Sequence, residues 1–146
     1  MATIRAMVID DSRIMRSMVM NALRQARLAE FEFVEAEDGA DALAKFKPGE
    51  VDMCFVDWNM PNMTGVEFVR KARAGGAAFH IPMVMVTSEQ TVAKIEEALN
   101  QCGADGYVCK PFTFEDLRVK LDKIVNKVLK GKAPPEKKGF FANLFS

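Results

Sequence analysis

The sequence has few of the residues on which several common kinds of protein chemistry depend. It contains one histidine, His80, and three cysteines, Cys54, Cys102 and Cys109, with no CxxC spacing. The single histidine is expected in a loop and no Ser-His-Asp triad is indicated by the sequence. An odd number of cysteines argues against a disulfide framework. This cysteine usage fits a reducing compartment, where we expect Cys54 and Cys109 to be small buried hydrophobic residues.

Three further absences narrow the class of protein. The formal net charge is +0, so we expect no bulk electrostatic attraction to nucleic acid or to a membrane surface. No Gly-rich phosphate-binding loop is present, which disfavours a bound nucleotide. No apolar run approaches the roughly 20 residues that span a bilayer, and the start of the chain lacks the apolar core of a secretory signal. We therefore expect a cytoplasmic protein without stable membrane insertion.

The composition is that of one globular domain, with 146 residues of which 49% are hydrophobic and 27% charged. Short apolar runs alternate with segments of helical periodicity. The runs cover residues 4–9, 33–36, 53–57, 81–86 and 106–109, and the helical segments cover 12–26, 40–46, 66–72, 92–101 and 113–129. This alternation predicts an α/β fold in which a five-stranded parallel sheet lies between helices, as a three-layer α/β/α sandwich.

A change in composition near Gly131 predicts the end of the domain. We expect a domain over residues 1–130, followed by a linker and a short apolar C-terminal tail over 131–146. The tail ends with Phe140, Phe141, Leu144 and Phe145, whose spacing places them on one face of a helical turn or two. Disorder, packing against the domain, docking into a partner's groove and weak membrane contact all stay open for this segment.

Polar side chains stand at the ends of four predicted strands. Asp10 and Asp11 follow the first strand, Asp57 ends the third, Thr87 follows the fourth and Lys110 follows the fifth. Because a parallel sheet gathers the carboxyl ends of its strands at one edge, we expect these side chains to share one cleft. Singly, each has an ordinary explanation: the acids can cap a helix, the threonine can end a turn, and the lysine can be a solvated charge.

Together these groups suit phosphoryl chemistry. Three carboxylates crowded in apolar surroundings repel one another, and a hard divalent cation would relieve that repulsion. Mg²⁺ prefers oxygen ligands and keeps several waters, so two or three protein oxygens suffice. A carboxylate such as Asp57 beside Mg²⁺ can attack a phosphoryl group and form an acyl phosphate. The cation, Lys110 and Thr87 could then each hold one phosphoryl oxygen.

The chain resembles the receiver domains of response regulators over about residues 3–129, most closely those of the chemotaxis type. The matching segments are Asp10-Asp11, Asp57-Trp58-Asn59-Met60-Pro61-Asn62-Met63, Thr87, Gly106-Tyr107 and Lys110-Pro111, in the order that the family shows. The resemblance implies a flavodoxin-like strand order. It also implies a single-domain regulator of a two-component system that a histidine kinase phosphorylates.

The resemblance assigns a role to each matching residue. Asp57 would be the phosphoacceptor. Asp11 and Asp57 would bind Mg²⁺ directly together with the backbone carbonyl of Asn59, and Asp10 would bind it through water. Lys110 would pair with the phosphoryl group, and the peptide bond between Lys110 and Pro111 would be cis.

The same resemblance implies a switch. Thr87 would move to the phosphoryl group and Tyr107 would turn inward behind it, remodelling the face made by the fourth helix, the fifth strand and the fifth helix. Half-buried packing is the ordinary alternative for Tyr107. Asn59 and Glu89 would influence autodephosphorylation. Asn59 stands where haloacid-dehalogenase phosphatases typically carry a second acid, so the chain is expected to catalyse only its own phosphorylation and dephosphorylation.

The output is expected to be a protein–protein contact of a monomer, because no DNA-binding or catalytic output domain fits after residue 129. The implied partners are a CheA-like histidine kinase and a flagellar motor switch protein or other output protein, with no nucleic acid. Two alternatives stay open. The chain could be a phosphorelay intermediate that passes phosphate to a histidine phosphotransfer protein, or a phosphorylation-independent interaction module that binds through its tail.

Overall fold

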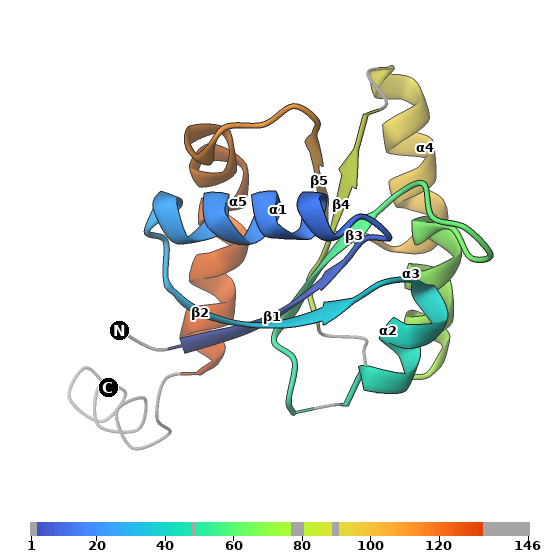
Figure 1. Ribbon diagram of the computed structural model, residues 1–146, viewed down its shortest axis with the longest axis horizontal. Helices are drawn as coiled ribbons and strands as arrows, with labels where there is room; N and C mark the ends of the chain where they lie inside the picture. Colours follow the sequence, from blue (N-terminus) through green and yellow to red (C-terminus); the bar gives the residue numbers. More distant parts are fainter. Residues whose placement is uncertain (1–2, 48, 77–80, 89–90, 133–146) are drawn as a thin grey trace, which may run out of the picture.

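A computed structural model of the chain describes residues 3–47, 49–76, 81–88 and 91–132. Within these residues, five strands alternate with five helices (Figure 1). The strands are β1 (Thr3–Ile9), β2 (Glu30–Ala36), β3 (Met53–Asp57), β4 (Met83–Thr87) and β5 (Gly106–Cys109). The helices are α1 (Arg13–Ala26), α2 (Gly39–Lys45), α3 (Gly65–Ala74), α4 (Val92–Cys102) and α5 (Phe114–Gly131). The predicted alternation is confirmed.

All strand pairs are parallel, and the strand order is β2-β1-β3-β4-β5. This is the flavodoxin-like order, in which the direction of winding changes between β1 and β3. Ligands of such sheets bind outside the carboxyl ends of the strands at that change. The topology therefore places Asp10, which follows β1, next to Asp57, which ends β3.

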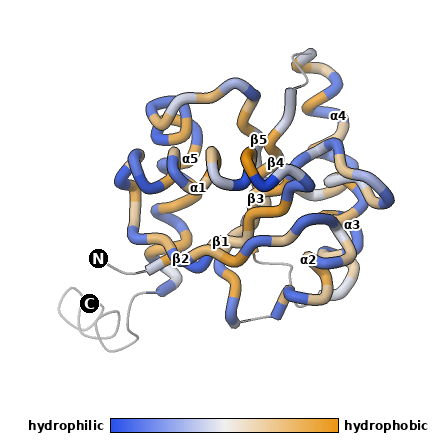
Figure 2. Tube along the Cα trace, in the orientation of Figure 1, coloured by the Kyte–Doolittle hydropathy of each residue, from blue (hydrophilic) through white to orange (hydrophobic). Residues whose placement is uncertain are grey.

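The central strand β3 shows why helices cover both faces of the sheet. All five of its residues are buried, and successive side chains point to opposite faces. Met53 and Phe55 belong to the core that packs against α1 and α5, whereas Cys54 and Val56 belong to the core against α2, α3 and α4. Hydrophobic residues run along the middle of the sheet, with hydrophilic ones frequent on the helices outside it (Figure 2). A strand buried on both sides holds Asp57 on a rigid base.

Side-chain caps fix where the helices begin. The Ser12 hydroxyl accepts a hydrogen bond from the Met15 amide and so caps α1, which leaves the Asp10 carboxylate available for the sheet edge. Thr113 and Asp116 form a reciprocal capping box at the start of α5, as their spacing predicts. The cap residue Ser12 directly follows Asp11, and the cap residue Thr113 lies a short turn after Lys110.

Two expectations about elements are corrected. The second strand begins at Glu30 and not at residue 33. The fourth begins at Met83 and not at Ile81, because Pro82 has no amide hydrogen and contributes only its carbonyl, to the Cys54 amide.

Cys54 is buried as expected, and burial raises the pKa of its thiol to about 12, but Cys109 is only half-buried. No helix among the described residues is both long and apolar enough to cross a membrane.

Candidate functional site

Backbone hydrogen bonds continue the sheet past the strand ends and hold the candidate site residues in place. The Asp10 amide donates to the Ala36 carbonyl at 3.1 Å, and the Trp58 amide donates to the Val86 carbonyl at 3.1 Å. The Lys110 amide donates to the Thr87 carbonyl at 2.7 Å. Each residue that carries a reactive group, or its immediate neighbour, is thus tied to the next strand.

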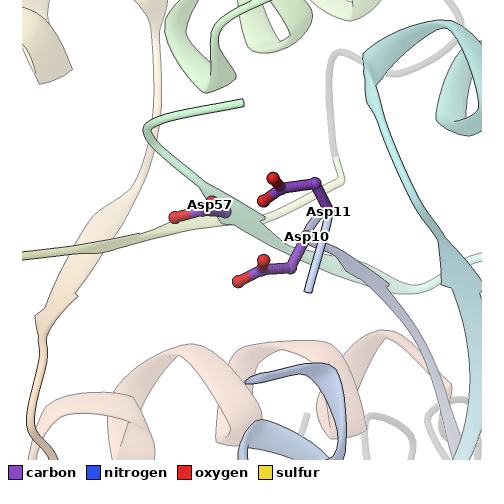
Figure 3. Close-up of side chains that lie close together, drawn as sticks. All are labelled: Asp10, Asp11 and Asp57. Carbon is purple, nitrogen blue, oxygen red and sulfur yellow. The ribbon is translucent and has the colours of Figure 1, made fainter. Parts of the chain in front are cut away.

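Three carboxylates come together at this edge. One oxygen from each of Asp10, Asp11 and Asp57 lies within 4.8 Å of the other two. Figure 3 shows the three side chains pointing toward one shared space between the ends of β1 and β3. Asp10 is only 3% exposed and Asp57 only 6%, whereas Asp11 is exposed. The site is therefore a buried pair of acids with a third at its mouth.

A single ammonium group faces these acids among the described residues. The Lys110 Nζ lies 3.0 Å from Asp57 Oδ1 and 3.6 Å from Asp10 Oδ2. The peptide bond between Lys110 and Pro111 is cis, as the resemblance implies. Three carboxylates and one ammonium leave an excess of negative charge in a partly desolvated pocket.

That excess is visible in the acid–base properties of the pocket. Burial raises the pKa of Asp57 above its ordinary value, and the nearby Asp11 carboxylate adds to the rise, against the lowering by the Lys110 ammonium and the Asn59 amide. Burial also raises the pKa of Asp10, opposed by its hydrogen bond from the Ser12 amide. The cluster holds its negative charge at a cost that a cation would offset.

The donor set fits Mg²⁺. Octahedral Mg²⁺ binds oxygen at about 2.0–2.1 Å, so ligand oxygens on one ion lie about 3–4 Å apart. The three acids offer carboxylate oxygens within 4.8 Å of one another, and all of them are hard oxygen donors. Among the described residues, no cysteine or histidine is part of the cluster, which disfavours softer metals.

Thr87 and Asn59 lie at the same edge of the sheet, and Tyr107 lies two residues before the pairing partner of Thr87. Thr87 ends β4 next to β3 and is 1% exposed, and Asn59 is exposed two residues beyond Asp57. Tyr107 is half-buried in β5, and the Lys120 ammonium lies 4.3 Å from the centre of its ring. Glu89, His80 and the tail after residue 132 lie outside the described residues.

The loop after Asp57 depends on a glycine that approaches the site backbone closely. The Gly65 amide donates to the Trp58 carbonyl at 3.0 Å. A Cβ atom on Gly65 would lie 2.3 Å from the Asp57 carbonyl oxygen and 2.8 Å from Met85 Cε. Only a residue without a side chain lets α3 begin so near the strand that carries Asp57.

One residue beside the site is not indicated by the sequence. The Arg16 Nη1 donates to the Asp10 carbonyl at 2.6 Å. A lone arginine in a helix with several basic residues gives no local signal, because its partner is defined only by how α1 packs beside β1. Its contact could be found only from the folded structure.

Comparisons with known proteins agree with this geometry. The family described as response regulator receiver domain matches residues 6–122. The chain is 40% identical over 124 residues to the chemotaxis protein CheY of Pseudomonas aeruginosa, covering 85% of this chain and 98% of that protein. It is 39% identical over 124 residues to CheY-3 of Vibrio cholerae, covering 85% of this chain and 93% of that protein. A solved structure of Vibrio cholerae CheY4 superposes with a TM-score of 0.70 at 35% identity, covering 87% and 99% of the two chains.

Proposed function

The chain belongs to the response regulator receiver domain family, and from that premise we propose that it is phosphorylated on Asp57 by a histidine kinase in a chemotaxis pathway. The observation that carries the proposal is the convergence of Asp57, two further acids and Lys110 at one edge of the sheet. Receiver-domain membership and likeness to CheY proteins support the same chemistry. The protein then acts by changing a contact with another protein.

Asp57 supplies the nucleophile. One of its carboxylate oxygens forms a bond to phosphorus while the bond from phosphorus to the donor's imidazole nitrogen breaks. The Lys110 ammonium, 3.0 Å from Asp57 Oδ1, is placed to neutralise a phosphoryl oxygen.

Asp10, Asp11, Asp57 and the backbone carbonyl of Asn59 are the groups that would hold Mg²⁺. When bound, the ion would neutralise charge on the phosphoryl oxygens. The chain's own contribution is to keep the two buried acids fixed on adjacent strands, so that the site needs little rearrangement. Asn59 and Glu89 then influence how long the phosphoryl group persists before the chain hydrolyses it, without turnover of outside substrates.

Thr87 and Tyr107 would carry the signal away from Asp57. Thr87 pairs with Cys109 of β5, and Tyr107 lies two residues earlier on that edge strand. We propose that Thr87 moves to a phosphoryl oxygen and that Tyr107 turns inward behind it. The half-buried ring, with Lys120 over it, is placed to change the surface between α4, β5 and α5.

The output face is the surface of α4, β5 and α5. Two large hydrophobic side chains are exposed there, Val92 at 54% and Val119 at 81%. A pocket of about 340 Å³ is lined by Val108, Cys109, Pro111, Asp116, Val119 and Lys120. We propose a CheA-like kinase and a flagellar motor switch protein as the protein's partners. We also propose that the protein is a cytoplasmic monomer whose domain covers residues 1–130.

The first test is phosphorylation by acetyl phosphate with Mg²⁺, followed by intact-mass spectrometry. Wild type should gain one phosphoryl group, and Asp57→Asn should gain none. Asp52→Asn is the matched control, because Asp52 precedes the same strand at its opposite end. It should label like wild type. Equal labelling of Asp57→Asn and wild type would remove the assignment.

The second test concerns the output. Beryllofluoride with Mg²⁺ mimics the phosphoryl group, and binding is then compared for a purified motor switch protein and a histidine phosphotransfer protein. Selective binding of the motor switch protein by the treated domain supports the proposal. Selective binding of the phosphotransfer protein would instead make the chain a phosphorelay intermediate.

A further inference from the structure

Arg16 is a largely buried arginine that joins the ends of two strands. Its guanidinium donates through Nη1 to the Asp10 carbonyl at 2.6 Å and through Nε to Glu35 Oε1 at 3.0 Å. Its side chain is 13% exposed. Glu35 is itself anchored, because the Lys45 ammonium donates to its carbonyl at 2.8 Å. The guanidinium is therefore a fixed donor and not a mobile surface charge.

The contact of Arg16 completes the hydrogen bonding of Asp10. The Asp10 amide donates to the Ala36 carbonyl, and the Asp10 carboxylate accepts from the Ser12 amide at 2.9 Å. With Arg16 on the carbonyl, every polar group of Asp10 is held. The carbonyl of Asp10 belongs to the peptide that joins Asp10 to Asp11, so this bond sets how the two neighbouring carboxylates are oriented.

We propose that Arg16 is a positioning residue for the metal site, holding the Asp10–Asp11 peptide so that both carboxylates face Asp57 (Figure 3). The inference rests on the proposed Mg²⁺ site of these three acids. It adds to that site a group that touches neither the metal nor the phosphoryl group. Outer groups that orient metal ligands commonly contribute as much to affinity as weak ligands do.

Electrostatics and positioning predict opposite results for this residue. Arg16 is a cation close to a cluster of acids, so removal of its charge alone should strengthen the binding of another cation. If Arg16 instead orients the acids, its removal should weaken binding, because the ligands must then be ordered by the metal itself. The sign of the change therefore identifies the role.

The experiment is a Mg²⁺ titration of the metal-free protein, read by the fluorescence of Trp58. Trp58 is the single tryptophan and directly follows Asp57. Arg16→Ala should raise the Kd for Mg²⁺ by on the order of tenfold. Arg16→Lys, which keeps the charge but not the two-way fork, should show a smaller rise.

Arg13→Ala is the matched control. Arg13 is the first residue of α1 and exposed, and it is not among the residues that hydrogen-bond or ion-pair with Asp10 in the described part of the chain. Arg13→Ala removes the same charge from the same helix as Arg16→Ala. The Kd of Arg13→Ala for Mg²⁺ should therefore equal that of wild type or be slightly lower. In metal-free protein, the Ser12 amide should also exchange with deuterium faster in Arg16→Ala than in Arg13→Ala, because its Asp10 acceptor is less fixed.

The outcomes separate this inference from the proposed function. If wild type shows no Mg²⁺ binding, both fail together. If wild type binds but Arg16→Ala has the Kd of Arg13→Ala or a lower one, only the role of Arg16 is overturned. Should Arg16→Ala not fold, Arg16→Lys and Glu35→Gln decide, since the first replaces the guanidinium and the second removes the charge of its Glu35 partner. Unchanged affinity in both would equally overturn the inference.

Discussion

At the amino-end edge of the sheet, Arg73 and Asp105 form an ion pair that resembles the pair of Lys110 and Asp57 at the carboxyl-end edge. Arg73 Nη2 lies 2.7 Å from Asp105 Oδ2, and the guanidinium also donates to the carbonyls of Ile81 and Gly103. The same Asp105 oxygen accepts from the Met83 amide at 2.8 Å. One carboxylate here meets one guanidinium and one backbone donor.

The carboxyl-end edge has the same kinds of group in a different ratio. Three carboxylates there face one ammonium, and burial raises the pKa of Asp10 and Asp57. At the amino-end edge, the charge of Asp105 is balanced by Arg73. At the carboxyl-end edge, the three acids have more negative charge than Lys110 balances. The comparison teaches that charge balance, more than residue type, separates a structural ion pair from a reactive site.

The largest effect should come from a methyl group added at each edge. Gly65→Ala places a Cβ 2.3 Å from the Asp57 carbonyl oxygen, a backbone clash that should cost about 3 kcal/mol. Gly103→Ala has room for its Cβ but keeps a φ of +81°, which should cost about 1–2 kcal/mol. Urea unfolding gives both values. Only Gly65→Ala should also slow labelling by acetyl phosphate, and equal slowing in both variants would contradict the division between the edges.

Removal of one negative charge from each edge should have opposite effects on stability. Asp105→Asn loses a charged acceptor of Arg73 and should lower the free energy of unfolding by about 1–2 kcal/mol, a modest loss because Asp105 is partly exposed. Asp10→Asn removes the cost of burying a charge and its repulsion by Asp57. It should raise the free energy of unfolding by about 1 kcal/mol without Mg²⁺. Urea unfolding at neutral pH without metal is the measurement. Losses of equal size in both variants would show that the carboxyl-end acids are satisfied after all.

The smallest effect is on the pH dependence of stability. A carboxyl whose pKa is raised by folding binds its proton more tightly in the native state, so its contribution is greatest below the unfolded pKa and is lost as pH rises through the folded pKa. Metal-free wild type should therefore lose stability relative to Asp10→Asn as the pH rises above about 4, the ordinary pKa of an aspartate. The Lys45 side chain lowers the pKa of Asp41, so Asp41 changes stability with pH in the opposite direction. Both proteins contain Asp41, so its contribution cancels when their stabilities are subtracted. A flat difference would contradict the raised pKa of Asp10.

The order of elements could be predicted because each buried strand is a short apolar run that ends at a polar residue. For β3, all five residues are buried and Asp57 is its last, so pattern and structure coincide. The start of β2 could not be found in this way. As an edge strand it alternates exposed glutamates with half-buried phenylalanines, and such a weak pattern hides its first residues.

The predicted cleft residues could be found because parallel topology alone brings strand ends together. The contacts that position them could not. Arg73 and Asp105 are 32 residues apart, and their meeting depends on how α3 packs against β4 and β5. Arg16 reaches Asp10 only because α1 lies beside β1. The apolar periodicity of a helix predicts which face packs inward, but it does not specify which polar side chains then meet.

The two edge strands of the sheet, β2 and β5, also affect whether two copies of the chain can pair with each other. β5 is only four residues long, and the longer edge strand β2 carries Glu30, Glu32 and Glu35. Charged side chains on an edge strand disfavour pairing with a second copy, although Glu32 and Glu35 are also paired with Arg5 and Arg16. β5 offers too few backbone groups to seed an extended sheet. Edge-to-edge aggregation is thereby resisted at high concentration. For a protein whose proposed output is a reversible contact with a partner, we expect these edge strands to disfavour pairing with its own copies.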